Sequence, residues 1–594
     1  MKYQVVVEAL GNSKEISVDE GANLWQILVE HGYEVPAYCG GSGVCGKCKV
    51  QVEAEDCLVG QNSEKRFGSH DKVQETRLAC SVVVKDNLRV KVEPPNELVV
   101  LTSGLVSQGI MKPRLKKEFI TLSPPTLADQ MDYANRIHTQ IGTNSIVTSA
   151  LIQLGSISKE EGFTVVVYQN KILKAEPGNT TQKFYGIAMD IGTTTIAIYL
   201  VNLQTGREVG VWSMHNPQQK YGADVVSRIN YTLQEAQGRL QLQKVLLAGI
   251  NGGIKSLAAK HKVDPQDIVA VSLVANTVIT HLLLGVNAIT IANAPYVPIF
   301  SDGLQLTALE LGLDVYSQAI ISIPPAVVGY VGSDIIADLL MVNLELNNYG
   351  LLIDLGTNGE IVLGGKGKIL ACSTAAGPAF EGTNITFGMA GVQGAISSMK
   401  LADDGNVEYA VIGNIPPKGI CGSGLVDGVA ELLRHGLIDE FGTFVEYSPL
   451  VTDFKGLKAL RIVAASNSGT EDDIFLTQKD VREFQLAKGA VAAGITILLQ
   501  EMEISKSEVS ALYLAGGFGN YVNPRNACVT GIIPRELEDR VIRIGNGAGA
   551  GSKRYLLDQA AVTTGAELQK KIQYVELSSR LDFQTQFVDA MMFE

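Results

Sequence analysis

A ten-residue stretch of the sequence, Tyr185-Gly-Ile-Ala-Met-Asp190-Ile-Gly-Thr-Thr194, occurs a second time as Tyr349-Gly-Leu-Leu-Ile-Asp354-Leu-Gly-Thr-Asn358. Five of the ten positions are identical, and most of the others are conservative exchanges. Each copy is an apolar run that ends at Asp and enters a Gly-Thr turn, and a second strand-like run follows at Ile196 to Val201 and at Glu360 to Leu363. This pattern predicts two β-hairpins, one in each half of a duplicated domain.

Both hairpin turns carry residue types that bind phosphate groups. Gly192 and Gly356 have no side chain, so backbone amides at these turns can approach phosphate oxygens closely. Short side chains at the turns add hydrogen-bond donors: Thr193, Thr194, Thr357 and Asn358. Asp190 and Asp354 end the first strand of each hairpin, where carboxylates can hold a hydrated Mg2+ ion and orient an attacking water. The repeat therefore predicts a site for ATP and Mg2+, with Asp190 and Asp354 as its catalytic residues.

The repeated motif D-[IL]-G-T-[TN] resembles the two phosphate hairpins of the acetate and sugar kinase, Hsp70 and actin superfamily. The resemblance implies a duplicated α/β ATPase domain with a glycine-rich segment that touches adenosine. Ala511-Leu-Tyr-Leu-Ala-Gly516-Gly517 fits that segment, because a strand runs into a pair of glycines. A second candidate is Gly422-Ser423-Gly424, which opens the helical pattern Leu425 to His435. A helix N-terminus favours an anion there, and a tight packing turn explains the three residues equally well.

Two other nucleotide-binding patterns fit the sequence less well. The P-loop pattern G-x-x-x-x-G-K-[ST] does not occur. Gly545-Asn-Gly547-Ala-Gly549-Ala550 satisfies a loose G-x-G-x-x-A pattern. A dinucleotide-binding fold requires an acidic residue about 20 positions later, and none stands 20 positions after Gly545. A dinucleotide-binding fold is therefore not expected.

Four cysteines have the spacing C-x5-C-x2-C-x31-C: Cys39, Cys45, Cys48 and Cys80. Glycines surround the first three, and a loop around an iron–sulfur cluster needs positive φ angles to turn its amides toward the sulfurs. A zinc site would instead have two close pairs of cysteines. Cys57 is the alternative fourth ligand. The spacing resembles that of adrenodoxin-like 2Fe-2S ferredoxins, and Arg77-Leu-Ala-Cys80 resembles their fourth-ligand segment, which implies a β-grasp domain with a 2Fe-2S cluster.

The composition indicates a folded protein that acts on neither nucleic acid nor membranes. The chain has 594 residues, of which 46% are hydrophobic, and a net charge of −13, whereas nucleic acids and anionic membranes attract clustered Lys and Arg. Residues 269–300 are uncharged, but their polar residues and two prolines favour a buried strand and helix over a membrane span. The N-terminal residues lack a signal-peptide pattern and clustered cysteines suit a reducing compartment, so we expect a cytoplasmic protein. The isolated Cys372, Cys421 and Cys528 are expected to be buried small residues.

The sequence divides into four segments of a multidomain α/β and α+β chain. Residues 1–95 are expected to form the ferredoxin-like domain, which ends at two prolines, and residues 96–115 a linker. Residues 116–183 are expected to form a small α/β middle domain, and residues 184–594 the duplicated actin-like ATPase domain. Within the ATPase domain, Asp224 and Arg228 stand four positions apart, which indicates a surface ion pair on a helix.

A 2Fe-2S domain and a duplicated ATPase domain on one chain resemble the ATP-dependent reductive activators of corrinoid proteins over the whole length. Asn216-Pro-Gln218, Tyr221 to Arg228 and Asp354 to Glu360 also resemble that family's C-terminal domain. The resemblance implies an enzyme that couples ATP hydrolysis to electron transfer and returns Co(II) of a corrinoid partner to Co(I), with an external low-potential electron donor. The corrinoid-binding signature D-x-H-x-x-G is absent, which assigns the cobalt to the partner. A homodimer stays open.

The family resemblance also suggests which partner is reduced. Methylamine-type activators carry a C-terminal cysteine cluster, and its absence here favours the corrinoid/iron–sulfur protein of the acetyl-CoA pathway. An activator of another corrinoid methyltransferase is the alternative within the family. A small-molecule kinase of the superfamily would leave the ferredoxin domain idle, and activators of 2-hydroxyacyl-CoA dehydratases resemble the chain only in the nucleotide fold. A non-catalytic scaffold for electron carriers is a third class.

Overall fold

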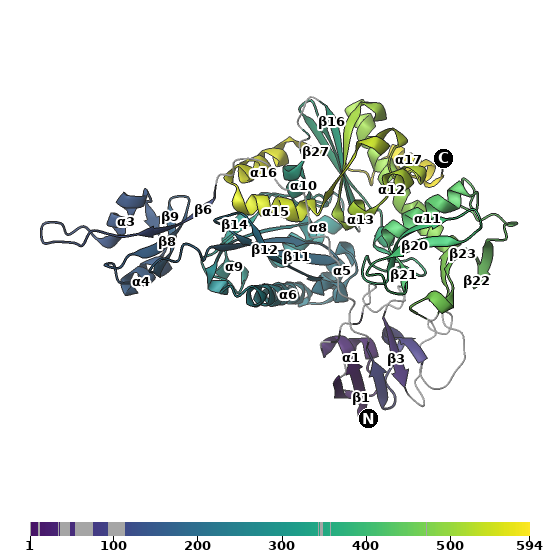
Figure 1. Ribbon diagram of the computed structural model, residues 1–594, viewed down its shortest axis with the longest axis horizontal. Coiled ribbons are helices and arrows are strands. Elements are labelled where there is room, and N and C mark those ends of the chain that lie inside the picture. Colours follow the sequence, from purple (N-terminus) through teal and green to yellow (C-terminus); the bar gives the residue numbers. More distant parts are fainter. Residues whose placement is uncertain are drawn as a thin grey trace. The chain divides into compact units, whose positions relative to one another are not determined.

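The computed structural model describes residues 2–9, 12–31, 33, 35, 48–53, 75–92, 113–342, 344, 348–356, 358–470 and 472–593 (Figure 1). The chain divides into two compact units. The first contains Met1–Val99, Pro217–Leu242 and Gly377–Ala487, and the second contains Val100–Asn216, Gln243–Ala376 and Lys488–Glu594. Strands of the described residues form six sheets, with helices beside them, which confirms the predicted mixture of α/β and α+β parts.

The ferredoxin-like part of the first unit is a five-stranded sheet packed against α1 (Leu24–Glu30). Its strands, in the order β2-β1-β5-β3-β4, are β1 (Lys2–Ala9), β2 (Asn12–Asp19), β3 (Lys49–Glu53), β4 (Glu75–Leu78) and β5 (Leu88–Lys91). Val5 and Val7 alternate inward along β1 and are fully buried with Leu28 of α1. The Asn23 side chain caps α1 by accepting hydrogen bonds from backbone N–H groups of the first turn. This sheet and helix agree with the ferredoxin-like domain expected at the N-terminus.

The remainder of the first unit consists of short sheets and helices. Its elements include α5 (Val225–Gln234), α11 (Gly422–Arg434) and the three-stranded sheets β20-β19-β21 and β22-β23-β24. The strands of these sheets are β19 (Ala395–Leu401), β20 (Val407–Val411), β21 (Gly419–Ile420), β22 (Val451–Phe454), β23 (Leu457–Val463) and β24 (Ile474–Thr477).

Helix α5 shows that the predicted surface position of Arg228 is wrong, although the charge of Asp224 does act on it. Arg228 is fully buried, and its Nε donates to the carbonyl oxygen of Gly222 at 3.0 Å. Burial lowers the pKa of Arg228 to about 9. Asp224 is the N-cap of α5, and its side chain accepts a hydrogen bond from the backbone N–H of Ser227. Packing has turned the face that carries Arg228 inward, which the spacing of charges alone does not reveal.

A small α/β fold begins the second unit after residue 112. Its sheet has the order β6-β8-β9-β7, and its elements are β6 (Leu115–Ile120), α3 (Tyr133–Ile141), β7 (Ser145–Ile146), α4 (Thr148–Ser156), β8 (Phe163–Tyr168) and β9 (Lys171–Pro177). Ile137 of α3 and Ala150 of α4 are fully buried against β8 and β9. The Asp132 side chain caps α3, and Gly142 ends it in the left-handed conformation. These helices and strands agree with the small α/β domain expected for residues 116–183.

The rest of the second unit contains two sheets that share the same order over five strands and carry their sixth strand at opposite edges. The first has the order β12-β11-β10-β13-β15-β14, and the second β26-β25-β16-β17-β18-β27. The first sheet is formed by β10 (Tyr185–Ile191), β11 (Thr195–Asn202), β12 (Glu208–His215), β13 (Ile268–Ala275), β14 (Leu304–Thr307) and β15 (Ile320–Ile323). The second is formed by β16 (Tyr349–Leu355), β17 (Gly359–Gly365), β18 (Lys368–Thr374), β25 (Val509–Ala515), β26 (Val541–Gly545) and β27 (Ile572–Tyr574).

The pairing of the strands confirms the predicted duplication. β10 pairs antiparallel with β11 and parallel with β13, and β16 pairs antiparallel with β17 and parallel with β25. Both copies of the repeated motif therefore lie at the centre of their sheets. Parallel central strands place their carboxyl ends at one edge of each sheet, which is where ligands bind in open α/β sheets.

Two helices hold the duplicated halves together. α10 (Ser333–Met341) packs on the second sheet, and α15 (Gly547–Leu557) packs on β10 and β13 of the first (Figure 1). The two helices also contact each other, because α15 has small residues on the contact face. A Cβ at Gly551 would collide with the carbonyl oxygen of Ala337, and a Cβ at Gly547 with Asp338. The glycines that resemble a dinucleotide loop therefore permit a close helix crossing.

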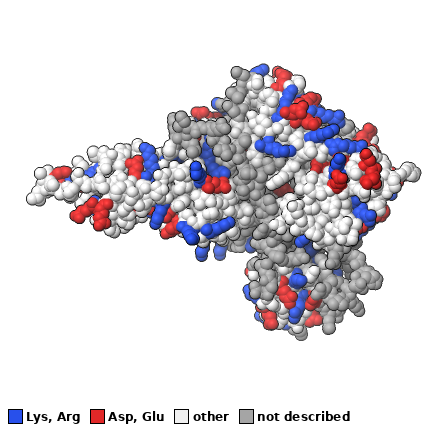
Figure 2. All heavy atoms as spheres, in the orientation of Figure 1, with Lys and Arg blue, Asp and Glu red and all other residues white. Residues whose placement is uncertain are grey.

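The uncharged stretch of residues 269–300 begins with a buried strand and a buried helix, as predicted, and its last residues, 293–300, are largely exposed. β13 is buried along its whole length, and α7 (Thr277–Leu283) follows it with every residue buried. In the part of the chain that the structure describes, no helix has both the length and the apolar character to cross a membrane. On the face in view in Figure 2, Lys and Arg side chains are intermingled with Asp and Glu.

Candidate nucleotide and cluster sites

The first hairpin presents Asp190 beside a tight turn. The backbone N–H of Gly192 donates to the carbonyl oxygen of Thr195 at 2.8 Å. Asn276, the N-cap of α7, donates from Nδ2 to Thr193 Oγ1 at 3.0 Å. Asp190 is half-buried, and its Oδ2 accepts a hydrogen bond from Asn546 Nδ2 at 2.9 Å. Burial raises the pKa of Asp190 to about 6, although the hydrogen bond from Asn546 works against the rise.

The second hairpin presents Asp354 beside a shorter turn. The backbone N–H of Gly356 donates to the carbonyl oxygen of Asn358 at 3.0 Å, and both residues are half-buried. Thr357 lies outside the described residues. Burial raises the pKa of Asp354 to about 7, and the negative charge of Asp190 adds to the rise. The two hairpins therefore bring both predicted catalytic carboxylates into electrostatic contact.

Gly516 and Gly517 differ in what surrounds them. Gly516 starts α13 (Gly516–Tyr521) directly after β25, with φ +79°. A Cβ at Gly516 would lie 2.5 Å from Asp354 Oδ1, so glycine is needed both for its backbone conformation and for space. Gly517 is exposed, and nothing lies within 4 Å of where its Cβ would be. The predicted adenosine segment thus ends beside the Asp354 carboxylate.

Three acidic residues that the sequence analysis did not single out surround Asp354. Asp334 and Asp338 come from α10, one turn apart, and Glu360 lies directly opposite Asp354 in β17. Burial raises the pKa of Asp334 to about 7, and the negative charge of Asp354 is the next largest cause of the rise. Burial and the charges of Asp334 and Asp354 raise the pKa of Glu360 well above its usual range. A signal existed, because two aspartates four positions apart interrupt an otherwise apolar helix.

Asp338 is the most deeply buried of these carboxyl groups. It is fully buried, and no described donor reaches either of its carboxylate oxygens. Burial, together with the charges of Asp354, Asp334 and Asp190, raises its pKa well above the usual range. By contrast, the buried Asp480 of the first unit accepts hydrogen bonds from Thr386 and Thr477. A structural carboxylate has its oxygens satisfied, and Asp338 does not.

The carboxyl cluster has the chemistry that Mg2+ requires, although its members do not converge into a closed cage. Among the described residues, no three acidic, cysteine or histidine side chains stand close enough together to hold a metal ion by themselves. Mg2+ keeps several water ligands and takes one or two carboxylates plus phosphate oxygens, so an open carboxyl-lined wall suits it. The orphaned oxygens of Asp338 and the elevated pKa values show excess negative charge that a cation or protons must balance.

Gly422, Ser423 and Gly424 are explained by packing within the first unit. All three are buried in the first turn of α11. Ser423 Oγ donates to the carbonyl oxygen of Ser397 at 2.7 Å, and a Cβ at Gly424 would collide with the carbonyl oxygen of Ile396. These contacts agree with the packing-turn interpretation of the segment, because the hydroxyl already has an acceptor.

Two of the four predicted cluster ligands lie side by side in the ferredoxin-like part. Cys48 is fully buried just before β3, and Cys80 is half-buried in the short 3-10 turn Ala79–Ser81. Their Sγ atoms are 3.1 Å apart, and the backbone N–H of Ala79 donates to the Cys48 carbonyl oxygen at 2.7 Å. Cys39, Cys45 and the alternative ligand Cys57 lie outside the described residues. Adjacent sulfurs brought together from positions 32 apart are what two ligands of one iron–sulfur cluster require.

The other cysteines are buried, as predicted. Cys372, Cys421 and Cys528 are at most 5% exposed, and each lies among apolar residues. Burial raises the pKa of the Cys528 thiol to about 11, which keeps it protonated and inert.

The fold and these sites define a class of protein. Two sheets share the same order over five strands, and each has a D-x-G-T hairpin whose Asp lies within electrostatic reach of the other. Together they make an ATPase domain of the actin, Hsp70 and sugar-kinase type. This domain is joined on one chain to a ferredoxin-like domain.

Comparisons with known proteins identify the family. Family models match the 2Fe-2S iron–sulfur cluster binding domain over residues 7–85, the RACo linker region over 104–182, the RACo middle region over 185–347 and the C-terminal ASKHA domain of RACo over 348–594. The corrinoid activation enzyme RamQ of Eubacterium limosum is 31% identical over 599 residues, which is 98% of each chain. The chain therefore belongs to the family of ATP-dependent reductive activators of corrinoid proteins, as its resemblance implied.

Two further relatives agree with this assignment. The solved structure of a reductive activator for corrinoid, iron–sulfur protein matches with a TM-score of 0.77 and 31% identity, covering 100% of this chain and 98% of that one. A [Co(II) methylated amine-specific corrinoid protein] reductase of Methanosarcina barkeri is 25% identical over 416 residues, or 65% of this chain and 73% of its own. The 2Fe-2S and ASKHA domains identify a redox activator that binds an iron–sulfur cluster and ATP.

Proposed function

We propose that this chain hydrolyses ATP to drive the one-electron reduction of a corrinoid partner from Co(II) to Co(I), with the electron delivered through the ferredoxin-like domain. The observation that carries the proposal is the pairing of Asp190 and Asp354 across two phosphate hairpins on a chain that also brings Cys48 and Cys80 together. In each cycle ATP and water become ADP and phosphate, and one electron passes to cobalt. No phosphate group is transferred to the corrinoid.

The cluster is held by Cys39, Cys45, Cys48 and Cys80. When bound there, a 2Fe-2S cluster supplies one-electron transfer. The 3.1 Å separation of Cys48 Sγ and Cys80 Sγ supports the distant fourth ligand. Cys80→Ser should alter the visible and EPR spectra of the purified chain, whereas Cys57→Ser should leave both unchanged. Four irons per chain, or one zinc with no iron, would refute this ligand set.

Mg2+ is held on the Asp354 side of the nucleotide. Asp354, Asp334 and Glu360 supply the negative charge there, and phosphate oxygens and waters complete the coordination. Gly192, Gly356 and the turn side chains hold the phosphates, and Gly516 and Gly517 adjoin adenosine. Replacing Mg2+ by Mn2+ should give a nucleotide-dependent EPR signal that Asp354→Asn alters. A Mn2+ signal that is identical in Asp354→Asn and wild type would contradict this placement.

The corrinoid partner is the corrinoid/iron–sulfur protein of the acetyl-CoA pathway. The support is the cysteine pattern, because the C-terminal half has single buried cysteines in place of a second cluster. An external low-potential donor supplies the electron, and the clustered cysteines suit the reducing cytoplasm. The test is a parallel assay of ATP-dependent Co(I) absorbance with this partner and with a methyltransferase corrinoid protein. Faster activation of the methyltransferase protein would transfer the assignment to the alternative partner, and phosphorylation of a sugar or carboxylate would indicate a kinase.

A further inference from the structure

Arg114 occupies a junction in the second unit, two residues into its described part. Its side chain is 7% exposed and reaches three elements of that unit. Arg114 Nη1 donates to the carbonyl oxygen of Tyr555 in α15 at 3.0 Å. Nη2 donates to Ser322 Oγ in β15 at 2.9 Å and to the Tyr168 hydroxyl in β8 at 3.2 Å. One side chain thus ties the start of the small α/β fold to both halves of the ATPase.

The guanidinium of Arg114 is buried without a negative partner. Among the ion pairs of the described residues none includes Arg114, and its Nε has no hydrogen-bond acceptor. The rings of Tyr168 and Tyr555 lie 5.7 Å and 5.6 Å from its central carbon and supply its only other electrostatic support among the described residues. A buried charge without a counter-ion opposes stability, so an apolar side chain of similar length would suit a purely structural position better.

Helix α15 connects this junction to the nucleotide site. Asn546, the N-cap of α15, donates a hydrogen bond to Asp190. In the last turn of the same helix, the carbonyl oxygen of Tyr555 accepts a hydrogen bond from Arg114. Pro113 forms an isolated β-bridge with Asp558, the residue that ends α15. A helix of 11 residues is a rod of about 16 Å, and a packed rod moves as a unit. A shift at Asn546 therefore reaches Pro113 and Arg114.

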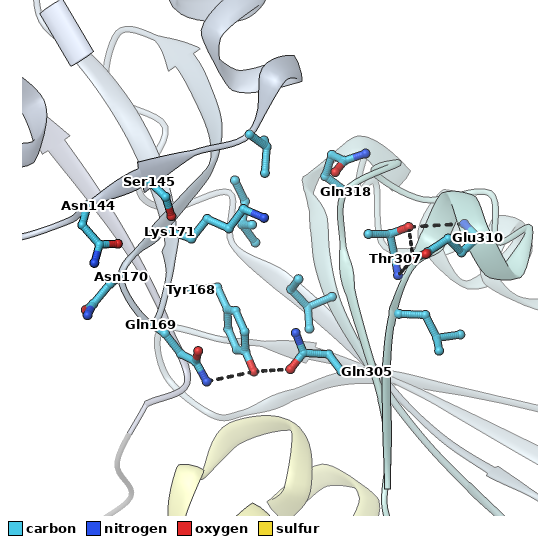
Figure 3. A pocket seen from close by; sticks show the side chains of 14 residues that line it. Asn144, Ser145, Tyr168, Gln169, Asn170, Lys171, Gln305, Thr307, Glu310 and Gln318 are labelled. Carbon is cyan, nitrogen blue, oxygen red and sulfur yellow. Dashed lines mark hydrogen bonds between the residues drawn. The ribbon is translucent and has the colours of Figure 1, made fainter. Parts of the chain in front are cut away.

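The small α/β fold receives the other arm of the junction. The Tyr168 hydroxyl donates to Gln305 Oε1 of the edge strand β14 at 2.7 Å (Figure 3), and both residues line a cleft of about 370 Å³. Gln169, Gln305 and Gln318 give the cleft a polar lining. Polar contacts of this kind rearrange more readily than an apolar interface, because water can replace them.

We propose that Arg114 is a positioning residue that transmits the nucleotide state from Asp190 through α15 to the segment that leads to the ferredoxin-like domain. The proposal rests on the function proposed above, in which ATP hydrolysis controls electron delivery. Helix α15 and the Arg114 side chain connect Asp190 with Pro113 and Arg114. In the sequence, these two residues follow the segment that leads from the ferredoxin-like domain.

The experiment compares hydrogen–deuterium exchange of β6 in the intact chain with and without Mg2+ and a non-hydrolysable ATP analogue. In wild type the nucleotide should change the exchange rate of residues 115–120 by about fivefold or more, and in Arg114→Met by less than about twofold. Arg114→Met should melt at the wild-type temperature or above, because it removes an unpaired buried charge. It should also bind the analogue within about threefold of wild type, since Arg114 does not line the nucleotide site.

Arg461→Met is the matched control. Arg461 is exposed and pairs with Asp473 in the first unit, so its loss should leave the exchange response unchanged. A wild-type response in Arg114→Met, or no response in wild type, overturns the proposal. If Arg114→Met does not fold, Ser322→Ala and Tyr168→Phe each remove one acceptor and should each weaken the response; an unchanged response in both overturns it. The exchange experiment contains no corrinoid partner, and Co(I) formation is measured separately. A wild-type chain that shows the exchange response but forms no Co(I) with the partner would support the role of Arg114 and refute only the proposed function.

Discussion

The two phosphate hairpins share a motif and differ in their surroundings. Asp190 lies opposite Ala197 and accepts a hydrogen bond from Asn546, so its cross-strand partner is apolar and its hydrogen-bond donor is neutral. Asp354 lies opposite Glu360 and faces the carboxyl groups of α10. The turns also differ, because Gly192 bonds to Thr195 whereas Gly356 bonds to Asn358, one residue nearer.

Duplication has therefore produced two unequal half-sites. The first is suited to holding phosphate through neutral groups, and the second concentrates negative charge that must be balanced by Mg2+ or by protons. The pKa of about 6 at Asp190 and of about 7 at Asp354 expresses the same asymmetry. We propose that the two aspartates have unequal roles, which the following variants can test.

The largest expected effect is on hydrolysis. Asp354→Asn should lower ATPase turnover by about 100-fold or more while ATP still binds, because it removes a group used mainly in the transition state. Asp190→Asn should lower turnover by only about tenfold, since its amide oxygen can still accept the hydrogen bond from Asn546. Steady-state phosphate release and equilibrium nucleotide binding measure both. Equal losses in the two variants would remove the asymmetry.

The next effect separates the two glycines of the adenosine segment. Gly516→Ala should weaken ATP binding by about 30-fold, because the new methyl group would displace the Asp354 carboxylate and φ +79° is unfavourable for alanine. Gly517→Ala meets open space in the nucleotide-free chain, so it should weaken ATP binding less than Gly516→Ala does. Titration calorimetry with an ATP analogue compares them. A larger loss in Gly517→Ala would indicate that the nucleotide touches Gly517 directly.

A smaller effect concerns pH. The raised pKa values mean that Asp190 and Asp354 bind protons more tightly in the nucleotide-free fold than in the unfolded chain. The stability that these two groups contribute is therefore fully present below about pH 4 and is lost as the pH rises through about 6 to 7. Asp354→Asn should reduce this fall by about 1 kcal/mol more than Asp190→Asn does, since one pKa unit corresponds to about 1.4 kcal/mol. Urea denaturation at pH 5.5 and pH 8 gives the comparison. Stability that rises with pH in wild type and falls in neither variant would contradict the sign.

The smallest effect lies at the first hairpin alone. Asn546→Ala removes the hydrogen bond that favours ionised Asp190, so the pKa of Asp190 should rise above about 6. A rise of about one unit would leave about half of Asp190 protonated at pH 7, and turnover should fall by about twofold there and recover at pH 8.5. A pH–rate profile measures the shift. A loss that persists at pH 8.5 would show that Asn546 acts through something other than this proton.

The sequence predicted those parts of the site that are local in the chain. Each hairpin needs only an apolar run, an Asp and a Gly-Thr turn, and β10, β11, β16 and β17 follow the predicted ranges closely. The pairing of Asp190 with Asn546 joins positions 356 apart, and no spacing rule reports such a contact. The glycines around Asn546 form a loose G-x-G-x-x-A pattern, which is typical of dinucleotide-binding loops and does not report the contact with Asp190.

The missed carboxylates and the misplaced arginine have a common cause. Asp334 and Asp338 matter only because α10 packs on the sheet of the other half, and Arg228 is buried only because α5 turns that face inward. Helical spacing shows which residues share a face, and tertiary packing decides where that face points. A charged residue in an apolar helix is the sequence feature that could have marked the two aspartates, whereas α5 is a mixed helix that gives no such signal for Arg228.

The decisive measurement follows Co(I) absorbance and phosphate release together in one reaction of the intact chain, the corrinoid partner, a reductant and ATP. Co(I) should form only with hydrolysable ATP and an intact cluster. Asp354→Asn should abolish both Co(I) formation and phosphate release. Cys80→Ser should abolish Co(I) formation and leave phosphate release intact. Co(I) that forms at the wild-type rate in Asp354→Asn, or without ATP, would contradict the coupling of this ATPase site to electron transfer.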